Sequence, residues 1–399
     1  MAPTGSRPTL EELRAAKRQR AQLHRGIHNL ALGALFVAAL LAVIVACWRT
    51  PDRAFSDAEN RRLAQAPDFS LSALADGSYF TGLSDYVSDQ FVGRDWWISL
   101  KLKMERLIGR KESNGVYLCQ DHYLIETPEA NDGLAMWRSI DAMNRFAAAH
   151  PGLNTQVLIA PNAITILEDL LPENAPKPDQ KATLGLIRSS LLSSIGFIDV
   201  TDALAAHAQE GIFYRTDHHW TSLGARYAFE AAAPGLGIVP LAAGYDVHVV
   251  SDSFEGTLAS KSGCHEVTDT VEVYTPLGTD VIYYVNYKDT QAKSRSLYVS
   301  SALEGKDHYT VFFGGNHPLL EVRTTTNNGR NLLIFKDSYA NCFVQFLTPY
   351  YDSIWLVDPR YYYDDVESVI QTANITDVLY LYNLNTFLSD TALADALGD

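Results

Sequence analysis

The chain has 399 residues, a formal net charge of −15 and an apolar fraction of 47%. Its length suffices for about two domains, and its acidic balance argues against nucleic acid as a partner, because phosphate groups would be repelled. The same balance leaves a neutral or acetylated glycan open as a ligand.

Residues 30–48 form an apolar stretch with no charged residue. At about 1.5 Å per residue, a helix of this length spans roughly 30 Å of hydrocarbon. Six basic residues precede the stretch, against only Glu11 and Glu12: they are Arg7, Arg14, Lys17, Arg18, Arg20 and Arg25. Because basic flanks stay on the cytoplasmic side, we expect a cytoplasmic tail over 1–29, a single transmembrane helix over 30–48 in the cell membrane, and all later residues outside.

A cleaved signal sequence is the alternative to this anchor. Residues 44–47 loosely resemble a lipoprotein cleavage site, with Cys47 as the lipidated residue. The apolar stretch and the tail before it are both long for a signal peptide, and Trp48 directly after the cysteine is unfavourable for a peptidase. Both alternatives leave the remaining chain tethered outside the cytoplasm.

Residues 49–115 predict a stalk that becomes helical near the membrane, with apolar and basic residues mixed over 95–110. From 116 onward, amphipathic segments alternate with short apolar ones. Helices are expected over 183–195, 202–209, 339–347, 366–373 and 386–397, with strands over 156–160, 197–200, 332–335, 353–357 and 378–382. This alternation predicts an α/β domain over 116–399, in which a parallel sheet is covered by helices on both faces.

The alternation breaks between about 235 and 329, where period-two segments such as 271–274 and 281–285 predict a β-rich insertion. Outside the apolar stretch the chain has three cysteines, Cys119, Cys264 and Cys342. An odd number cannot all pair internally. One disulfide fits an oxidising compartment, but the sequence does not select the pair.

The first of three polar junctions lies at residues 216–221, just before a helix predicted over 223–233. Asp217 and His219 would point to the same side of an extended segment. A carboxylate in that position fixes the tautomer of an imidazole and stabilises its protonated form. The segment equally suits a plain helix start, with Thr221 or Ser222 as the N-cap.

A metal site at this junction would also need His218, and adjacent residues in an extended chain face opposite ways. No HExxH motif or paired-cysteine spacing supplies further ligands. We therefore expect neither a metal nor a cofactor.

The second junction follows the strand at 332–335 and contains Ser338. A serine at a strand-to-helix turn sits at the positive end of the helix, where its own N–H can stabilise an oxyanion. Helix capping by Asp337 or Ser338 is the alternative. The third junction is Asn383, whose amide could supply a second oxyanion donor or simply make a turn. Asn385 and Arg360 are weaker candidates.

Several long strings of this sequence resemble the bacterial DHHW protein family. They are the name-giving DHHW at 217–220, IFKDSYANCF at 334–343, FFGGNHP at 312–318, VDPRYY at 357–362 and SDAENRRLAQAPDFS at 56–70. The family looks like a branch of the SGNH hydrolases and is similar to periplasmic proteins that O-acetylate alginate. The resemblance implies a flavodoxin-like sheet with a circularly permuted motif order, since ordinary SGNH esterases place the serine first.

Carried over by position, the resemblance makes Ser338 the nucleophile, His219 the base and Asp217 the acid of a catalytic triad. Asn383 matches the oxyanion-hole asparagine only by its place after a strand, and the glycine donor of ordinary SGNH enzymes has no clear counterpart. Four neighbours are expected to contact the substrate: His218, Trp220, Tyr339 and Arg360.

The resemblance implies an extracytoplasmic O-acetyltransferase of a cell-surface polysaccharide. Its expected partners are the polysaccharide acceptor, the membrane and a multispanning membrane acyltransferase that delivers acyl groups. A carbohydrate O-acetylesterase, or a non-catalytic glycan-binding or assembly protein on the same scaffold, are the alternatives. The sequence does not separate transferase from esterase, because the difference lies in water exclusion and acceptor positioning.

Overall fold

The computed structural model describes residues 9–56, 61–128 and 133–398. The described residues divide into two compact units, one of residues 9–56 with 61–97 and one of residues 98–128 with 133–398. The boundary between the units falls inside helix α4 (Arg94–Leu107).

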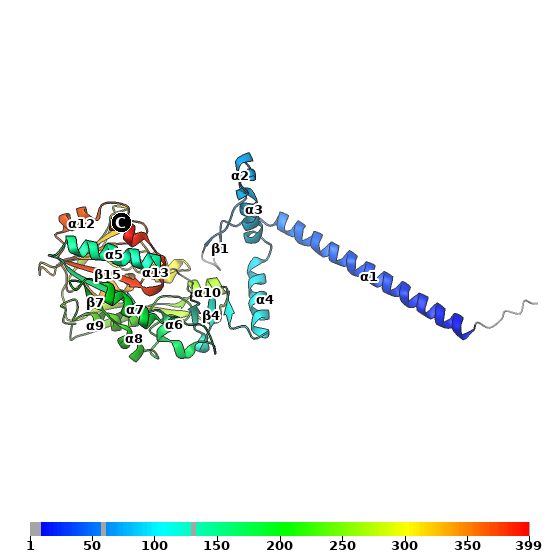
Figure 1. Ribbon diagram of the computed structural model, residues 1–399, viewed down its shortest axis with the longest axis horizontal. Coiled ribbons are helices and arrows are strands. Elements are labelled where there is room, and N and C mark those ends of the chain that lie inside the picture. The colour runs from blue at the N-terminus through cyan, green and yellow to red at the C-terminus, as the bar shows by residue number, and fades with distance from the viewer. Residues whose placement is uncertain (1–8, 57–60, 129–132, 399) are drawn as a thin grey trace, which may run out of the picture. The chain divides into compact units, whose positions relative to one another are not determined.

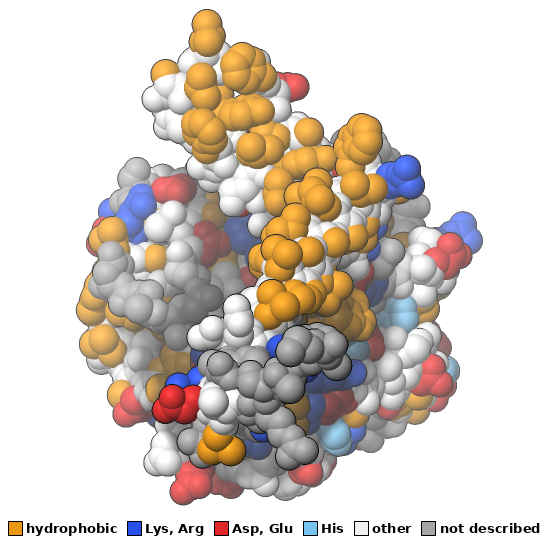
Figure 2. Space-filling model, turned by 90° about the vertical axis from the view of Figure 1, so that its right-hand side faces the viewer, with side chains coloured by type: hydrophobic (Ala, Val, Ile, Leu, Met, Phe, Trp, Pro, Cys, Tyr) orange, Lys and Arg blue, Asp and Glu red, His pale blue; other side chains and the backbone are white. Residues whose placement is uncertain are grey.

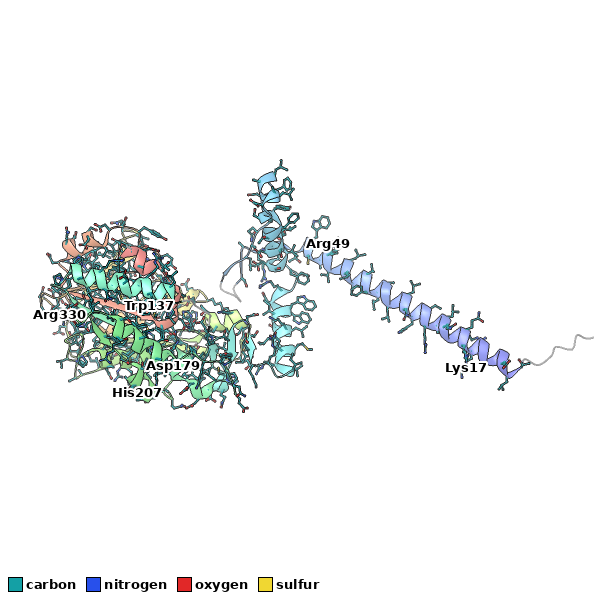
Figure 3. The ribbon with its side chains drawn as sticks, in the orientation of Figure 1. Lys17, Arg49, Trp137, Asp179, His207 and Arg330 are labelled. Carbon is teal, nitrogen blue, oxygen red and sulfur yellow. The ribbon has the colours of Figure 1, made fainter. Side chains whose placement is uncertain are left out.

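The first unit begins with the long helix α1 (Leu10–Arg49). From Lys17 to Arg49 (Figure 3) this helix is long and apolar enough to cross a membrane, and the apolar stretch predicted over 30–48 lies inside it. Hydrophobic side chains gather over this N-terminal segment (Figure 2). The short hairpin of β1 (Phe55–Ser56) and β2 (Arg61–Arg62) follows, then helices α2 (Leu71–Ala75) and α3 (Ser78–Asp89).

An eight-stranded sheet forms the centre of the second unit. In spatial order its strands are β11 (Lys293–Ser294), β10 (Tyr283–Tyr287), β12 (Leu319–Thr324), β14 (Ser353–Val357), β13 (Asn331–Lys336), β15 (Asp377–Asn383), β6 (Asn154–Ala160) and β7 (Gly196–Ile198). The five strands from β14 to β7 are parallel. If β6 and β7 are placed after β15, their order is 2-1-3-4-5 counted from β13, the flavodoxin-like order. The predicted circular permutation is therefore visible in the sheet itself.

Helices cover both faces of this sheet (Figure 1). One apolar core joins the sheet to α5 (Leu134–Ala149), α7 (Gln180–Ser190), α12 (Val366–Ala373), α13 (Leu384–Ser389) and α14 (Ala392–Ala396). The other joins it to α6 (Ala163–Ile166), α8 (Thr201–Ala206), α9 (Ser222–Ala232) and α11 (Tyr339–Phe343). Alternate residues of β13 serve the two cores, Leu333 one and Leu332 the other, because successive side chains of a strand face opposite ways.

The predicted β-rich stretch is present, but its second half joins the central sheet. Strand β12 pairs antiparallel with β14, and β10 pairs antiparallel with β12, so the parallel sheet continues into an antiparallel edge. The first half forms a separate hairpin of β8 (Tyr245–Phe254) and β9 (Asp269–Pro276), linked by helix α10 (Thr257–Ser262). A small sheet of β3 (Glu112–Ser113), β4 (Val116–Leu118) and β5 (Leu124–Glu126) precedes α5. The four cysteines, all of them described, carry free thiols.

Candidate active site

Two segments distant in sequence form the site at the carboxyl end of the parallel strands. One is the turn after β13 that contains Ser338, and the other is the loop 213–220 that leads into α9. The loop is a narrow hairpin turn rather than the extended segment expected, since Phe213 bridges to Trp220 and the Tyr214 amide donates to the His219 carbonyl. This turn, and not a period of two, brings Asp217 and His219 to the same side.

Asp217, His219 and Ser338 form a continuous hydrogen-bonded series. The Nδ1 atom of His219 lies 2.5 Å from Oδ2 of Asp217, and its Nε2 lies 2.7 Å from Oγ of Ser338. Asp217 and His219 are buried, whereas Ser338 keeps partial access to solvent. This is the geometry of a nucleophile, a base and an orienting carboxylate.

The second carboxylate oxygen of Asp217 is held by the start of α10. Both the backbone N–H and the hydroxyl of Thr257 donate to Oδ1, at 2.8 and 2.7 Å. A Cβ on the preceding Gly256 would lie 2.2 Å from the Cβ of Asp217, so only glycine permits this approach. Asp269 holds the same loop from the other side by accepting the Arg215 and Thr216 amides.

The imidazole of His219 is fixed from its face as well as its edge. The ring of Tyr309 stacks on it, with centroids 3.8 Å apart and an interplanar angle of 12°. The hydroxyl of Tyr309 donates to the carbonyl oxygen of Ser338 at 2.8 Å. One side chain therefore contacts both the ring of His219 and the backbone of Ser338.

The pKa values of His218 and His219 shift in opposite directions. Burial and the neighbouring charge of His218 lower the pKa of His219 to about 4, against the opposing influence of Asp217. Burial also disfavours the charged form of His218, but the Asp217 carboxylate outweighs it and raises the pKa of His218 to about 9. These shifts favour a neutral His219 that can accept a proton, beside a positively charged His218.

Ser338 stands at the N-cap position of α11, but its hydroxyl makes no capping hydrogen bond. Asp337 takes that role, since its carboxylate accepts the Tyr339 amide at 2.8 Å. Asp337 also accepts the backbone and side-chain N–H groups of Asn383, at 2.8 and 2.6 Å. Burial raises the pKa of the Asp337 carboxyl, against the hydrogen bonds and cations around it. The capping alternative for the serine hydroxyl is thereby excluded in this structure.

Asn383 lies at the end of β15, next to the nucleophile turn, but its amide is already engaged. Its second N–H donates to the Thr386 hydroxyl at 2.8 Å, and its oxygen accepts from Asn162 at 3.0 Å. As an oxyanion donor it would have to exchange one of these bonds. That role stays a prediction, whereas its contact with Asp337 is a feature of the fold.

Trp220 and Tyr339 are fully buried and join the two segments of the site. The indole N–H of Trp220 donates to the Tyr339 carbonyl at 3.0 Å, and the Tyr339 hydroxyl donates to the His218 carbonyl at 2.6 Å. His218 itself faces the Thr257 hydroxyl through Nδ1 at 2.8 Å. In this structure Trp220 and Tyr339 therefore connect the loop 213–220 to the turn that contains Ser338. Their contact with substrate remains a prediction.

Arg360 follows β14 and pairs with Asp358 through Nε and a terminal nitrogen, at 2.8 and 2.6 Å. The fully buried Lys336 donates to the same carboxylate at 3.3 Å and to Asn316 at 3.2 Å. Burial lowers the pKa of Lys336, while Asp358 acts against that shift. Arg360 also lines a cavity of about 370 Å³ with Tyr362, Tyr363, Asp364 and Asp390, among others.

Asp217, His218 and His219 present ligand atoms within 4.8 Å of one another, so the expectation that the histidines face apart is wrong. Each ring nitrogen of His219 already has a protein partner, however, in Asp217 and Ser338. The arrangement fits proton transfer better than coordination of an ion.

Sequence reasoning missed Thr257, Gly256 and Tyr309, because each reaches the site from a stretch assigned to the insertion. The FFGGNHP string pointed to the region just after Tyr309 but not to the residue itself. No local pattern marks a tyrosine that stacks on a histidine 90 residues away.

Comparisons with known proteins bear on the family and the fold. A profile described as DHHW protein matches residues 59–121 and 139–357, more than half of the chain. The crystal structure of a DHHW family protein from Eubacterium siraeum superposes with a TM-score of 0.61 at 26% identity, covering 71% of this chain and 95% of that chain. No curated protein sequence matches.

Other similar structures are more distant in sequence. PatB1 of Bacillus cereus, solved with a sulfonyl adduct, gives a TM-score of 0.60 at 19% identity and covers 69% of this chain and 97% of that one, which shows a shared fold. The O-acetyltransferase domain of Pseudomonas putida AlgJ gives 0.44 at 13% identity, with coverages of 69% and 93%. On the profile match, this chain belongs to the DHHW protein family.

Proposed function

We propose that this chain is an O-acetyltransferase of a cell-surface polysaccharide, with Ser338 as its nucleophile. The observation that carries the proposal is the series from Asp217 through His219 to Ser338, with both ring nitrogens of His219 in hydrogen-bond contact. Such a series serves acyl transfer on many unrelated folds. The similarity to PatB1 adds the scaffold, and the sulfonyl adduct of that protein suggests a probe for this one.

The proposed reaction has two steps. His219 Nε2 takes the proton of Ser338 as Oγ attacks the acyl carbonyl, and the protonated imidazole then gives that proton to the departing group. An acyl ester on Ser338 remains. A sugar hydroxyl next gives its proton to His219 and attacks the ester, after which Ser338 recovers its proton. Asp217 stabilises the imidazolium in both steps.

The oxyanion of each tetrahedral intermediate needs donors beside Ser338. The backbone N–H of Ser338 is our first candidate, because it opens the turn into α11. The Asn383 amide is the second, provided that its bond to Asp337 or Thr386 is exchanged on substrate binding. The transferase reaction further requires that an acceptor sugar displace water from the acyl-enzyme.

We place the acceptor in the cavity beside Arg360. This cavity lies beyond the end of β14, the strand that pairs in parallel with the nucleophile strand β13. Its lining combines tyrosines, which stack on sugar rings, with aspartates that accept hydrogen bonds from hydroxyl groups. Asp364 and Asp390 line it beside Arg360, whose charge is already paired with Asp358, while Asp395 is paired with Arg138. A neutral or amino sugar therefore suits it better than a polyuronate.

The location is part of the proposal. Helix α1 would cross the cell membrane once, with the N-terminus in the cytoplasm and the sheet domain outside. Acyl groups formed in the cytoplasm would then need a carrier, and a multispanning membrane acyltransferase is the expected donor. Tethering would raise the effective concentration of Ser338 near that donor.

The test uses the full-length chain in lipid nanodiscs with an activated acetyl ester, with and without neutral oligosaccharides. Acetylated oligosaccharide from the native chain, and none from Ser338→Ala, supports the proposal. Acetate release that oligosaccharide does not divert indicates an esterase instead. If neither product forms although the chain is folded, the site is not catalytic toward acetyl esters and the proposal is wrong.

A further inference from the structure

Helix α4 has two faces of different character. Leu102 is buried in a small core with Val116, Leu124 and Leu258, and Ile98, one turn earlier, approaches Gly263. These contacts define the side on which α4 packs against its own domain. Since a helix turns by about 100° per residue, Leu100, Met104 and Leu107 of the second unit lie on the opposite side, at spacings of 4 and 3.

That opposite side is apolar, and the second unit does not cover it. The side chains of Met104 and Leu107 are exposed, Leu107 by 79%. We call these residues, with Leu100, the α4 stripe. A soluble domain normally keeps such a contiguous stripe against its core. Here the core-facing side of the helix is already used by Leu102, so the α4 stripe faces away from the fold.

The charges of α4 differ from those of the chain. The helix carries Arg94, Lys101, Lys103 and Arg106 against Asp95 and Glu105, a net charge of +2. The whole chain stands at −15. Lys101 and Lys103 flank the α4 stripe on its two sides, where long side chains can reach polar headgroups while their methylenes stay against the apolar region. An apolar stripe bordered by lysines is typical of helices that lie in a membrane interface.

We propose that α4 is an interfacial helix whose stripe inserts into the outer surface of the bilayer crossed by α1. The chain itself supports lipid as the occupant. The candidate membrane span ends at Arg49, and α4 begins within 45 residues of it. Positive charge on α4 suits anionic headgroups, whereas the acidic remainder of the chain does not.

This arrangement would give the chain a second attachment besides α1. Leu102 and Ile98 link α4 to the sheet domain, so a membrane-bound stripe would hold that domain at the bilayer surface instead of leaving it on a free tether. The inference depends on α1 as a membrane helix but not on any acyl transfer, so the two proposals fail independently.

The test places an environment-sensitive fluorophore at Met104→Cys in the full-length chain. Cys47 and Cys119 are replaced by serine, and the buried Cys264 and Cys342 are kept. The protein is reconstituted into bilayers of phosphatidylethanolamine and phosphatidylglycerol that contain nitroxide-labelled lipid. Leu40→Cys in α1 reports the anchor, and Asp141→Cys, exposed on α5, is the control away from lipid.

We expect nitroxide lipid to quench the label at 104 by about twofold or more, as at 40, with little effect at 141, because interfacial helices bury their apolar face at the headgroup boundary. Leu107→Glu should reduce the quenching at 104 without lowering the unfolding temperature, since its side chain is not packed. Quenching at 40 but not at 104 would overturn the inference. The inference would also fail if the label at 104 were shielded from water in native membranes yet unquenched in bilayers that contain this chain alone. A protein partner would then cover the stripe.

Discussion

The Nε2 atom of His219 lies 2.7 Å from the Oγ atom of Ser338, although the two residues are 119 positions apart in the chain. The contact closes a series that begins at Asp217 and passes through a neutral imidazole. It joins a hairpin turn before α9 to the end of strand β13. The proposed chemistry follows from this contact, and the predictions below test the groups that maintain it.

Replacing Ser338 or His219 by alanine should each abolish most of the esterase or transferase rate, by about 10⁴-fold, since members of a triad act as a unit. The double variant should therefore be no slower than either single one. Initial rates with an activated acetyl ester measure this. Independent, multiplicative losses would show that the two residues do not work together.

Thr257→Val should slow the acyl-transfer step by roughly tenfold, because a charge-assisted hydrogen bond to Asp217 contributes about 1.5 kcal/mol or more. Thr257→Ser keeps the hydroxyl and is the matched control. The readout is kcat at saturating ester, together with the unfolding temperature. Equal kcat in the valine and serine variants would mean that the hydroxyl does not support the acid.

Gly256→Ala should lower both stability and activity, since the added Cβ would meet the Cβ of Asp217 at 2.2 Å. Overpacking of this kind costs about 1–3 kcal/mol. Gly185→Ala is the control, because nothing lies within 4 Å of its added Cβ in α7. That change should be neutral or stabilise the chain by about 0.5–1 kcal/mol. Urea unfolding compares the two, and an unaffected Gly256→Ala would contradict the close approach.

The value of kcat/KM should fall as the pH drops through about 4, because His219 must be neutral to accept a proton and its pKa is lowered to about 4. His218→Gln removes the neighbouring positive charge that helps to lower this pKa. The pKa of His219 should then rise, and the loss of activity on the acid side should begin at a higher pH. An acid limb that stays in place would show that His218 is uncharged in the free protein.

Much of the architecture could be predicted from the sequence, because short apolar runs between polar junctions, such as 353–357 and 378–382, form buried strands. The long DHHW and IFKDSYANCF strings pointed to Asp217, His219 and Ser338, and the structure brings the three side chains together. The argument for Asp217 and His219 assumed an extended segment, however, and the turn that aligns them is set by the long-range pair of Phe213 and Trp220.

What escaped prediction depends on contacts between distant segments. Thr257 and Tyr309 reach the triad only because the β8–β9 hairpin and the loop before β12 pack against it. The spacing of apolar residues in the sequence does not predict that packing. The amide of Asn383 was expected to face the oxyanion, but in the structure it donates a hydrogen bond to the buried carboxylate of Asp337. Such competition for a hydrogen bond is decided by burial, which a single sequence does not display.

The most direct test of the central claim is the intact mass of the full-length chain after brief incubation with an activated acetyl ester, followed by acid quenching and peptide mapping. The account predicts one acetyl group, carried on the peptide that contains Ser338, and its disappearance when a sugar acceptor is added. A parallel incubation with a sulfonyl fluoride should modify the same serine. Absence of any adduct, or an adduct that persists in Ser338→Ala, would contradict Ser338 as the nucleophile.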